Sequence, residues 1–77
     1  MISARLAYEH LHQALINARR AAGLTQAEVA DRLSRPQSFV SKYEQGERRL
    51  DVVEFVAVCR ALGVDPLVML KSVIGHG

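Results

Sequence analysis

A chain of 77 residues, of which 49% are hydrophobic, suffices for one compact core but is too short to divide into two domains. Its single cysteine excludes an internal disulfide, and its longest uninterrupted apolar run, residues 55–59, is far shorter than a membrane span. We therefore expect a cytoplasmic protein without membrane contact, in which residues 1–77 form one domain. The net charge of +2 permits a nucleic-acid partner but argues only weakly for one.

Apolar periodicity and turn signals predict helices along the whole chain. A first helix ends at Gly23, and it begins either after a cap at Ser3 or beyond a frayed segment of seven residues. One side of this helix is a stripe of residues at helical spacing, which are Leu11, Leu15, Ala18 and Ala22.

Two short helices follow. Thr25 and Glu28 match a capping box, in which each side chain binds the other residue's backbone N–H, and a helix runs from there to about Leu33. Its inward residues are Val29, Ala30 and Leu33. Residues 34–36 interrupt the pattern, because Pro36 disfavours helical geometry at the residue before it and suits the first turn of a new helix. The third helix is predicted over residues 36–45, before Gly46.

Two further helices complete an all-α chain of five helices. Asp51 is a predicted N-cap, and Gly63 ends the fourth helix. The inward stripe of this helix is Val52, Phe55, Cys59 and Leu62. Asp65 and Pro66 repeat the start signal for a fifth helix over about residues 66–74.

The third helix has an unusual polar face. With about 100° between successive residues, its polar residues fall within an arc of roughly 140°, and Phe39, Val40 and Tyr43 lie opposite. Glu44 lies at the boundary of the two faces. The polar residues are Gln37, Ser38, Ser41, Lys42 and Gln45. Short hydroxyl and amide side chains allow close approach and offer both donors and acceptors, which suits the reading of base edges in a major groove. An ordinary polar surface helix is the alternative, and composition alone does not separate the two.

Positive charge concentrates around this helix. Between residues 32 and 49 there are five cations (Arg32, Arg35, Lys42, Arg48, Arg49) against two acids (Glu44, Glu47), a local charge of +3. Such an excess suits a surface that faces phosphate, because neutralising phosphates releases counterions. A capped helix, a three-residue turn and a second helix with a polar outer face together predict a helix-turn-helix over about residues 25–45.

Over residues 11–67 the sequence resembles the lambda-repressor-like or Cro-like, Xre-type helix-turn-helix family. The segments that carry the resemblance are ARRAAGLTQAEVADRL, SFVSKYEQGERR and ALGVDP, in the order and spacing of the family. The resemblance implies a compact lambda-repressor-like domain that binds double-stranded DNA. It also implies a buried ion pair between Arg19 and Glu44, which fastens the recognition helix to the first helix.

The resemblance and the helix-turn-helix geometry together assign a role to each polar side chain. The predicted base-reading residues are Gln37, Ser38, Ser41 and Lys42. The predicted phosphate contacts are Thr25, Gln26, Arg35, Tyr43, Arg48 and Arg49. Two positions depart from the family pattern: Ser34 stands where glycine is common in the turn, and Pro36 where a Ser or Thr cap is common. The second departure leaves open whether Gln37 or Ser38 enters the groove deepest.

Other chemistry finds little support in the sequence. Cys59 lies on a predicted buried stripe, where a cysteine packs as a small apolar residue. His10 and His12 are two apart and point to different sides of a helix, and His76 falls in the terminal tail, so we expect no metal site. Because no catalytic set or phosphate loop is visible, we expect neither an enzyme nor a cofactor.

The last two helices, over about residues 51–74, are predicted to form a homodimer. Leu67 and Leu70 suffice to seat the fifth helix on the core, which leaves surplus apolar surface elsewhere. The predicted interface is Val53, Val56, Ala57, Val68, Met69, Val73 and Ile74. An apolar tail packed on its own core is the alternative.

The sequence thus predicts a dimeric transcription regulator, acting as a repressor on an inverted-repeat operator. The alternative from another class is a protein-interaction module, such as an antitoxin that sequesters a partner protein and binds DNA only secondarily. The pattern does not separate a prophage repressor, a restriction-modification controller and a housekeeping regulator.

Overall fold

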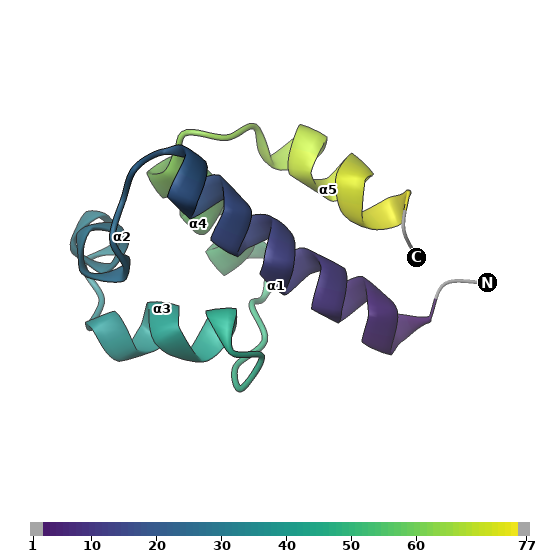
Figure 1. Cartoon of the computed structure of the whole chain (residues 1–77), viewed down its shortest axis with the longest axis horizontal. Helices are drawn as coiled ribbons and strands as arrows, with labels where there is room; N and C mark the ends of the chain where they lie inside the picture. Colours follow the sequence, from purple (N-terminus) through teal and green to yellow (C-terminus); the bar gives the residue numbers. More distant parts are fainter. Residues whose placement is uncertain (1–2, 76–77) are drawn as a thin grey trace.

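The computed structural model describes residues 3–75, which form five α-helices and no strand (Figure 1). The helices are α1 (Ala4–Ala21), α2 (Gln26–Leu33), α3 (Gln37–Glu44), α4 (Val52–Leu62) and α5 (Pro66–Ile74). The predicted all-α, five-helix fold is therefore confirmed. None of the helices within residues 3–75 combines the length and the hydrophobicity needed to cross a bilayer. His76, which the sequence places in a terminal tail, lies outside the described residues.

The helix starts follow the predicted caps. The Ser3 hydroxyl accepts a hydrogen bond from the Leu6 backbone N–H at 3.4 Å, and α1 begins at Ala4. The alternative prediction, a helix that begins beyond a frayed segment of seven residues, is therefore wrong. Thr25 and Glu28 form both halves of their capping box, at 3.1 and 2.9 Å. Asp65 accepts from the Leu67 N–H at 2.8 Å. Side-chain acceptors at these positions satisfy backbone donors that a helix leaves unpaired. The local sequence therefore determines where these three helices begin.

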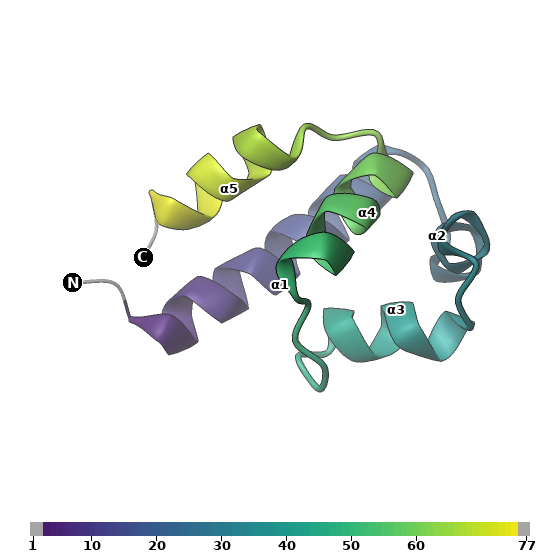
Figure 2. The same ribbon diagram turned by 180° about the vertical axis from the view of Figure 1, so that it is seen from behind.

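The helices pack around one core. α1 lies in front of α4 in Figure 1 and behind it in Figure 2, while α5 and α3 lie on opposite sides of α1 in both views. Four of the helices contribute side chains that are fully buried, and these are Leu15, Val29, Val40, Tyr43, Val58 and Cys59. Because α2, α3 and α4 share this core with α1, the outer face of α3 is held in a fixed direction.

The rotation of α5 differs from the prediction. Leu67 and Leu70, which were expected to seat the helix, are 69% and 45% exposed, whereas Met69 is only 8% exposed. Met69 packs toward Ala14 of α1, so it belongs to the core of its own chain and not to a predicted outer surface. Apolar residues occupy most sides of α5, so its periodicity could not choose the buried side, and contact with α1 and α4 decides it.

The start of α4 also differs. Val52, placed on the inward stripe, is 78% exposed, while Cys59 and Leu62 of the same stripe are buried. Val52 is the first residue of α4, where the chain arrives from a surface loop and the neighbouring helices no longer cover the stripe.

Candidate nucleic-acid interface

A helix-turn-helix forms at one end of the molecule. In Figure 1, α2 is seen nearly end-on and α3 from its side, so the two helices cross at a steep angle. The connecting residues begin with Ser34, whose backbone is left-handed at φ 54°, and its N–H bonds back to the end of α2. Glycine adopts this conformation without strain, which gives a physical reason for the glycine common at this position in the family that the sequence resembles. Pro36 then stands as the N-cap of α3 without a side-chain cap.

The two faces of α3 are as sharply divided as the helical wheel predicts. Phe39, Val40 and Tyr43 are buried against the rest of the domain, and Glu44 is 8% exposed. The outward residues are Gln37, Ser38, Ser41, Lys42 and Gln45, of which Ser41 is half-buried and the others exposed. Within this face the Gln45 amide donates to the Ser41 hydroxyl at 3.2 Å. The outward face is therefore free of bulky apolar groups and rich in hydrogen-bonding ones.

A buried ion pair fastens α3 to α1, as predicted. Arg19 Nε donates to Glu44 Oε2 at 2.7 Å, and Arg19 Nη2 donates to Glu44 Oε1 at 3.1 Å. Arg19 also donates to the Leu24 carbonyl at 3.0 Å, which ties the pair to the chain before α2. The two side chains are 14% and 5% exposed. The hydrogen bonds to the carboxylate raise the pKa of Arg19 above its usual range, so the guanidinium stays charged.

The same carboxylate orients two glutamines. Gln26 Nε2 donates to Glu44 Oε1 at 2.9 Å, which leaves the Gln26 oxygen to accept from Gln37 Nε2 at 3.4 Å. A chain of hydrogen bonds therefore runs from Arg19 through Glu44 and Gln26 to the first residue of α3. Gln37 keeps its own oxygen and its second amide hydrogen available toward solvent. An adenine edge can donate to the oxygen from its N6 amino group and accept the amide hydrogen at N7.

Comparison with known proteins agrees with this arrangement. Residues 13–69 match the family described as "Helix-turn-helix domain". Among solved structures, an XRE-family-like protein from Pseudomonas syringae pv. tomato str. DC3000 is 54% identical with a TM-score of 0.86, over 90% of this chain and 84% of that one. The chain belongs to the Xre-type helix-turn-helix family.

Two further proteins are similar to this family member. Two structures of the clp gene regulator ClgR from Corynebacterium glutamicum are 28% identical with a TM-score of 0.80, over 91% of this chain and 91% or 74% of the other. The restriction-modification controller protein C.AhdI from Aeromonas hydrophila is 28% identical with a TM-score of 0.73, over 87% of this chain and 98% of that one. A search of curated proteins found no match. The Xre-type family consists of DNA-binding transcription regulators, and this chain shares their fold along nearly its whole length.

One predicted phosphate contact is wrong for this Xre-type chain. Tyr43 is fully buried, with its ring edge-on to Phe39 at 5.6 Å between centroids, so its hydroxyl cannot reach a phosphate. That hydroxyl has no hydrogen-bond partner among the residues that the structure describes. Burial is the main cause that raises the pKa of Tyr43 well above its usual range. Its position on the apolar side of the helical wheel already indicated this role in the core.

The other predicted phosphate contacts lie at the surface of the Xre-type domain around α3. Thr25 is exposed at the start of α2, and Gln26 is half-buried beside it. Arg49 lies over the Tyr8 ring, with Cζ 4.2 Å from its centroid, and the His12 ring lies so near Gly46 that a Cβ added there would come within 3.3 Å of it. Partial burial and the charge of Arg49 lower the pKa of His12. The loop after α3 is thus held against α1.

Sequence reasoning missed Glu54. This carboxylate binds Arg48 at 2.6 Å and Arg35 at 3.5 Å, and it accepts from the Asp51 N–H at 3.0 Å. Asp51 and Glu54 form a second capping box, and the spacing of an acidic cap and a glutamate three residues later is the signal that could have found it. Glu54 therefore links three segments around α3: the turn before it, the loop after it and the start of α4.

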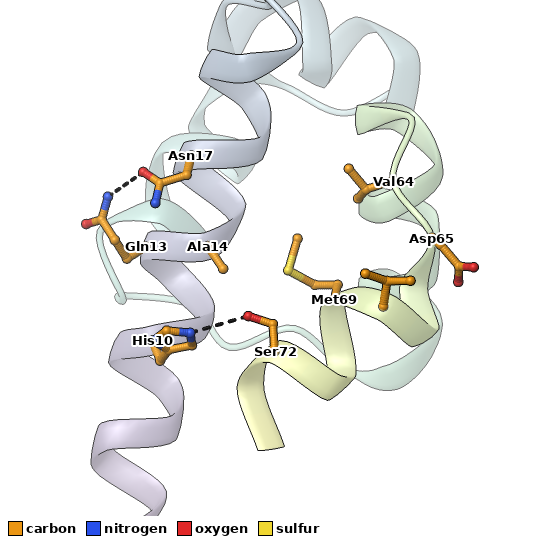
Figure 3. A pocket seen from close by; sticks show the side chains of 9 residues that line it. His10, Gln13, Ala14, Asn17, Val64, Asp65, Met69 and Ser72 are labelled. Atoms are coloured by element: carbon orange, nitrogen blue, oxygen red, sulfur yellow. Dashed lines mark hydrogen bonds between the residues drawn. The ribbon is translucent and has the colours of Figure 1, made fainter. Parts of the chain in front are cut away.

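Residues that suggested other chemistry are accounted for in the Xre-type fold. Cys59 is buried in the core as predicted, and burial raises the pKa of its thiol to about 11, so it stays protonated near neutral pH. A hollow of about 390 Å³ lies between α1 and α5, on the far side of α1 from α3. Figure 3 shows His10 bonded to Ser72, and the Met69 side chain extending between α5 and α1. The His10–Ser72 bond is 3.4 Å. Within residues 3–75, no group of three His, Cys, Asp or Glu side chains could hold a metal ion.

Proposed function

We propose that this protein is a sequence-specific repressor that occupies an inverted-repeat operator as a homodimer, with α3 in the major groove. The observation that carries the proposal is the divided surface of α3, whose buried side fixes its direction and whose outer side carries Gln37, Ser38, Ser41 and Lys42. In a helix-turn-helix, the residues near the start of the second helix contact base edges and the first helix crosses the backbone.

The base-reading roles follow from the hydrogen-bonding groups. Gln37 is a bidentate reader of adenine, Ser38 and Ser41 adapt to several edges, and Lys42 reaches guanine or a phosphate. The bond from Gln37 to Gln26 supports Gln37 as the deepest contact, because it fixes which way the amide faces before DNA arrives. Thr25, Gln26, Arg35 and Arg49 serve as phosphate contacts around this reader.

The dimer surface that we propose lies on α5 and the start of α4. Leu67, Leu70 and Ile74 share one side of α5 and are 69%, 45% and 57% exposed, and we name these three residues the α5 stripe. A hollow of about 150 Å³ beside Leu70 extends the stripe to Val52 and Leu11. A second copy covers this surface in our proposal, since a two-fold dimer presents two α3 helices to two half-sites.

This surface revises the predicted interface. Val73 and Ile74 stay in it, and Leu67 and Leu70 join it. Val53 is 79% exposed but, together with Ala57, borders a different hollow beside Phe39 and Glu54. Val68 lines the hollow on the other flank of α5. We therefore place Val53, Ala57 and Val68 outside the dimer surface, while Val56, one helical turn from Val52, stays in the predicted interface.

Sedimentation equilibrium of matched variants tests the dimer. We expect Leu67→Lys to give a monomer at concentrations where the unchanged protein is a dimer, because a buried lysine without a partner opposes association. Val53→Lys is the control, since it places the same charge on an equally exposed apolar position of α4. A monomeric unchanged protein at high micromolar concentration, or dissociation by Val53→Lys alone, would refute the proposed surface.

Selection of bound sequences from a random DNA pool tests the operator. We expect an enriched inverted repeat, and its absence would favour the alternative of a module whose exposed α5 stripe binds a partner protein. Gln37→Ala should then relax the base preference at one position in each half-site, at about 1–3 kcal/mol per lost contact. Gln13→Ala, an exposed glutamine on α1, is the matched control that should change nothing. Arg49→Ala should instead weaken all sequences alike and reduce the salt dependence.

A further inference from the structure

Glu54 is a charged hub on the α4 side of α3. Its Oε2 accepts from Arg48 Nη2 at 2.6 Å, and its Oε1 accepts from Arg48 Nη1 at 3.2 Å, so the two side chains meet as a fork. Arg35 reaches the same carboxylate through one contact only, at 3.5 Å. Both guanidinium groups lie over the Phe39 ring, with Cζ at 4.6 Å for Arg35 and 5.0 Å for Arg48.

The two arginines are held unequally. Arg48 binds Glu54 through two arms, one short at 2.6 Å and one at 3.2 Å, and Arg48 Nη1 also donates to the Arg49 carbonyl at 2.9 Å. The Glu54 side chain is 13% exposed, so the carboxylate is largely screened from water, which strengthens its pairing with a forked guanidinium. The Arg35 and Arg48 side chains are similarly exposed, at 46% and 39%, so the difference lies in their bonds. Arg35 has one long contact and can turn toward another anion at little cost.

We propose that Glu54 is a positioning residue that withholds Arg48 from the DNA backbone and leaves Arg35 and Arg49 to bind phosphate. This inference rests on the proposed function, since it concerns how the DNA-binding surface divides its charges. Arg48 then acts as a brace between α3, its following loop and α4, as Arg19 does between α3 and α1. The withheld charge lowers the sequence-independent part of DNA affinity, because each phosphate neutralised adds to non-specific binding.

The consequence concerns affinity for DNA of any sequence. A free arginine beside the recognition helix would strengthen binding to every DNA sequence by the same factor, which raises affinity without adding discrimination between operator and random DNA. By occupying Arg48, Glu54 keeps one cation out of that non-specific term, and its carboxylate remains in the capping box that starts α4.

Salt dependence of binding to random-sequence DNA measures the number of phosphates engaged. We take the slope as the steepness with which log K falls against log salt. In the otherwise unchanged protein, Arg49→Met should lower this slope by about 0.9, the value for one phosphate contact. Arg48→Met should leave that slope unchanged. Methionine keeps an unbranched stem, over Phe39 at position 48 and over Tyr8 at position 49, so both variants retain apolar contact while losing the charge.

Release of Arg48 is the second half of the test. Glu54→Gln removes the charge of the hub, and a glutamine at this position still completes a capping box, so the fold should persist. We expect this variant to raise the slope by about 0.9 and to bind random DNA more tightly than the unchanged protein. Adding Arg48→Met to Glu54→Gln should cancel the increase. Glu47→Gln, a loop acid one residue from Arg48, is the control: in its background Arg48→Met should stay without effect.

Two outcomes would overturn the inference while leaving the proposed function intact. One is a slope that Arg48→Met lowers as much as Arg49→Met does in the otherwise unchanged protein. The other is a Glu54→Gln variant whose slope does not respond to Arg48→Met. If neither the unchanged protein nor any variant bound DNA, the proposed function itself would be refuted. That result would not bear on whether Arg48 and Arg49 differ. Thermal unfolding of each variant separates loss of fold from loss of charge.

Discussion

The ion pair between Arg19 and Glu44 offers the most direct test of how α3 is held. Glu44→Gln keeps the size of the side chain and removes its charge, so Arg19 is left 14% exposed beside a neutral amide. Removing one partner of a buried pair costs about 3–5 kcal/mol, because the remaining charge is stranded. The amide oxygen can still accept one of the two bonds from Arg19, and we therefore expect the lower end, about 3 kcal/mol.

That loss is large for a domain of this size. A chain of 77 residues has an expected stability of about 4–12 kcal/mol, so the variant should fold but should unfold at a lower temperature than the unchanged protein. In a domain of this length each kcal/mol shifts Tm by about 4–8 °C, which gives a fall of about 12–24 °C. The fall should be accompanied by weaker operator binding, since Gln26 loses the carboxylate oxygen that orients its amide toward Gln37.

Urea and thermal unfolding followed by circular dichroism measure the loss. Arg19→Met and the double variant complete a cycle, in which the double variant should be more stable than the two single losses predict, with a coupling of about 2 kcal/mol. The reasoning would be refuted by a loss below about 1 kcal/mol for Glu44→Gln, the range of an exposed pair, or by strictly additive losses.

Three further predictions concern residues whose environments the structure defines. Tyr43→Phe should raise the free energy of unfolding by about 1 kcal/mol, because it removes a buried hydroxyl without a partner among the described residues; a loss of stability in urea would contradict this. Ser34→Gly should stabilise the fold by about 0.5–1 kcal/mol, because the relief of left-handed strain exceeds the cost of the added freedom of the unfolded chain. Ser34→Ala, measured in the same urea titration, should not stabilise it. The pKa of His12 is lowered in the folded state, so the folded protein takes up a proton there less readily than the unfolded chain does. This contribution to stability is present above about pH 6.5, the unfolded-state pKa, and is lost as the pH falls through the folded-state pKa. His12→Gln should therefore flatten the decline of stability with acid, and an unchanged decline in unfolding experiments across that range would exclude His12 as a cause.

Local sequence signals predicted the helices well because each rests on neighbouring residues. The capping box of Thr25 and Glu28 and the cap at Asp65 place donors and acceptors within three residues of each other, so the same bonds form wherever the segment lies. The polar arc of α3 likewise needs only the helical repeat. The pair of Arg19 and Glu44 came from family resemblance, and the structure confirms it at 2.7 Å.

Predictions failed where a residue's surroundings come from distant parts of the chain. Met69 and Leu67 are both apolar residues of α5, and the packing of α5 on α1 and α4 buries the first and leaves the second exposed. Tyr43 carries a group that could bind phosphate, but its side of α3 faces the core. Glu54 gathers Arg35 and Arg48 from segments 19 and 6 residues away, a meeting that no local pattern describes.

The sequence by itself thus determined five helices, most of their starts and the polar face of α3, because hydrogen bonds and side-chain periodicity over a few residues set them. Only the tertiary structure decided the buried side of α5 and the partners of the arginines around α3. Those depend on how helices far apart in the chain pack and on which charges then come within 4 Å of one another. The sequence located the candidate reading surface, and the packing determined which of the charges around it are paired.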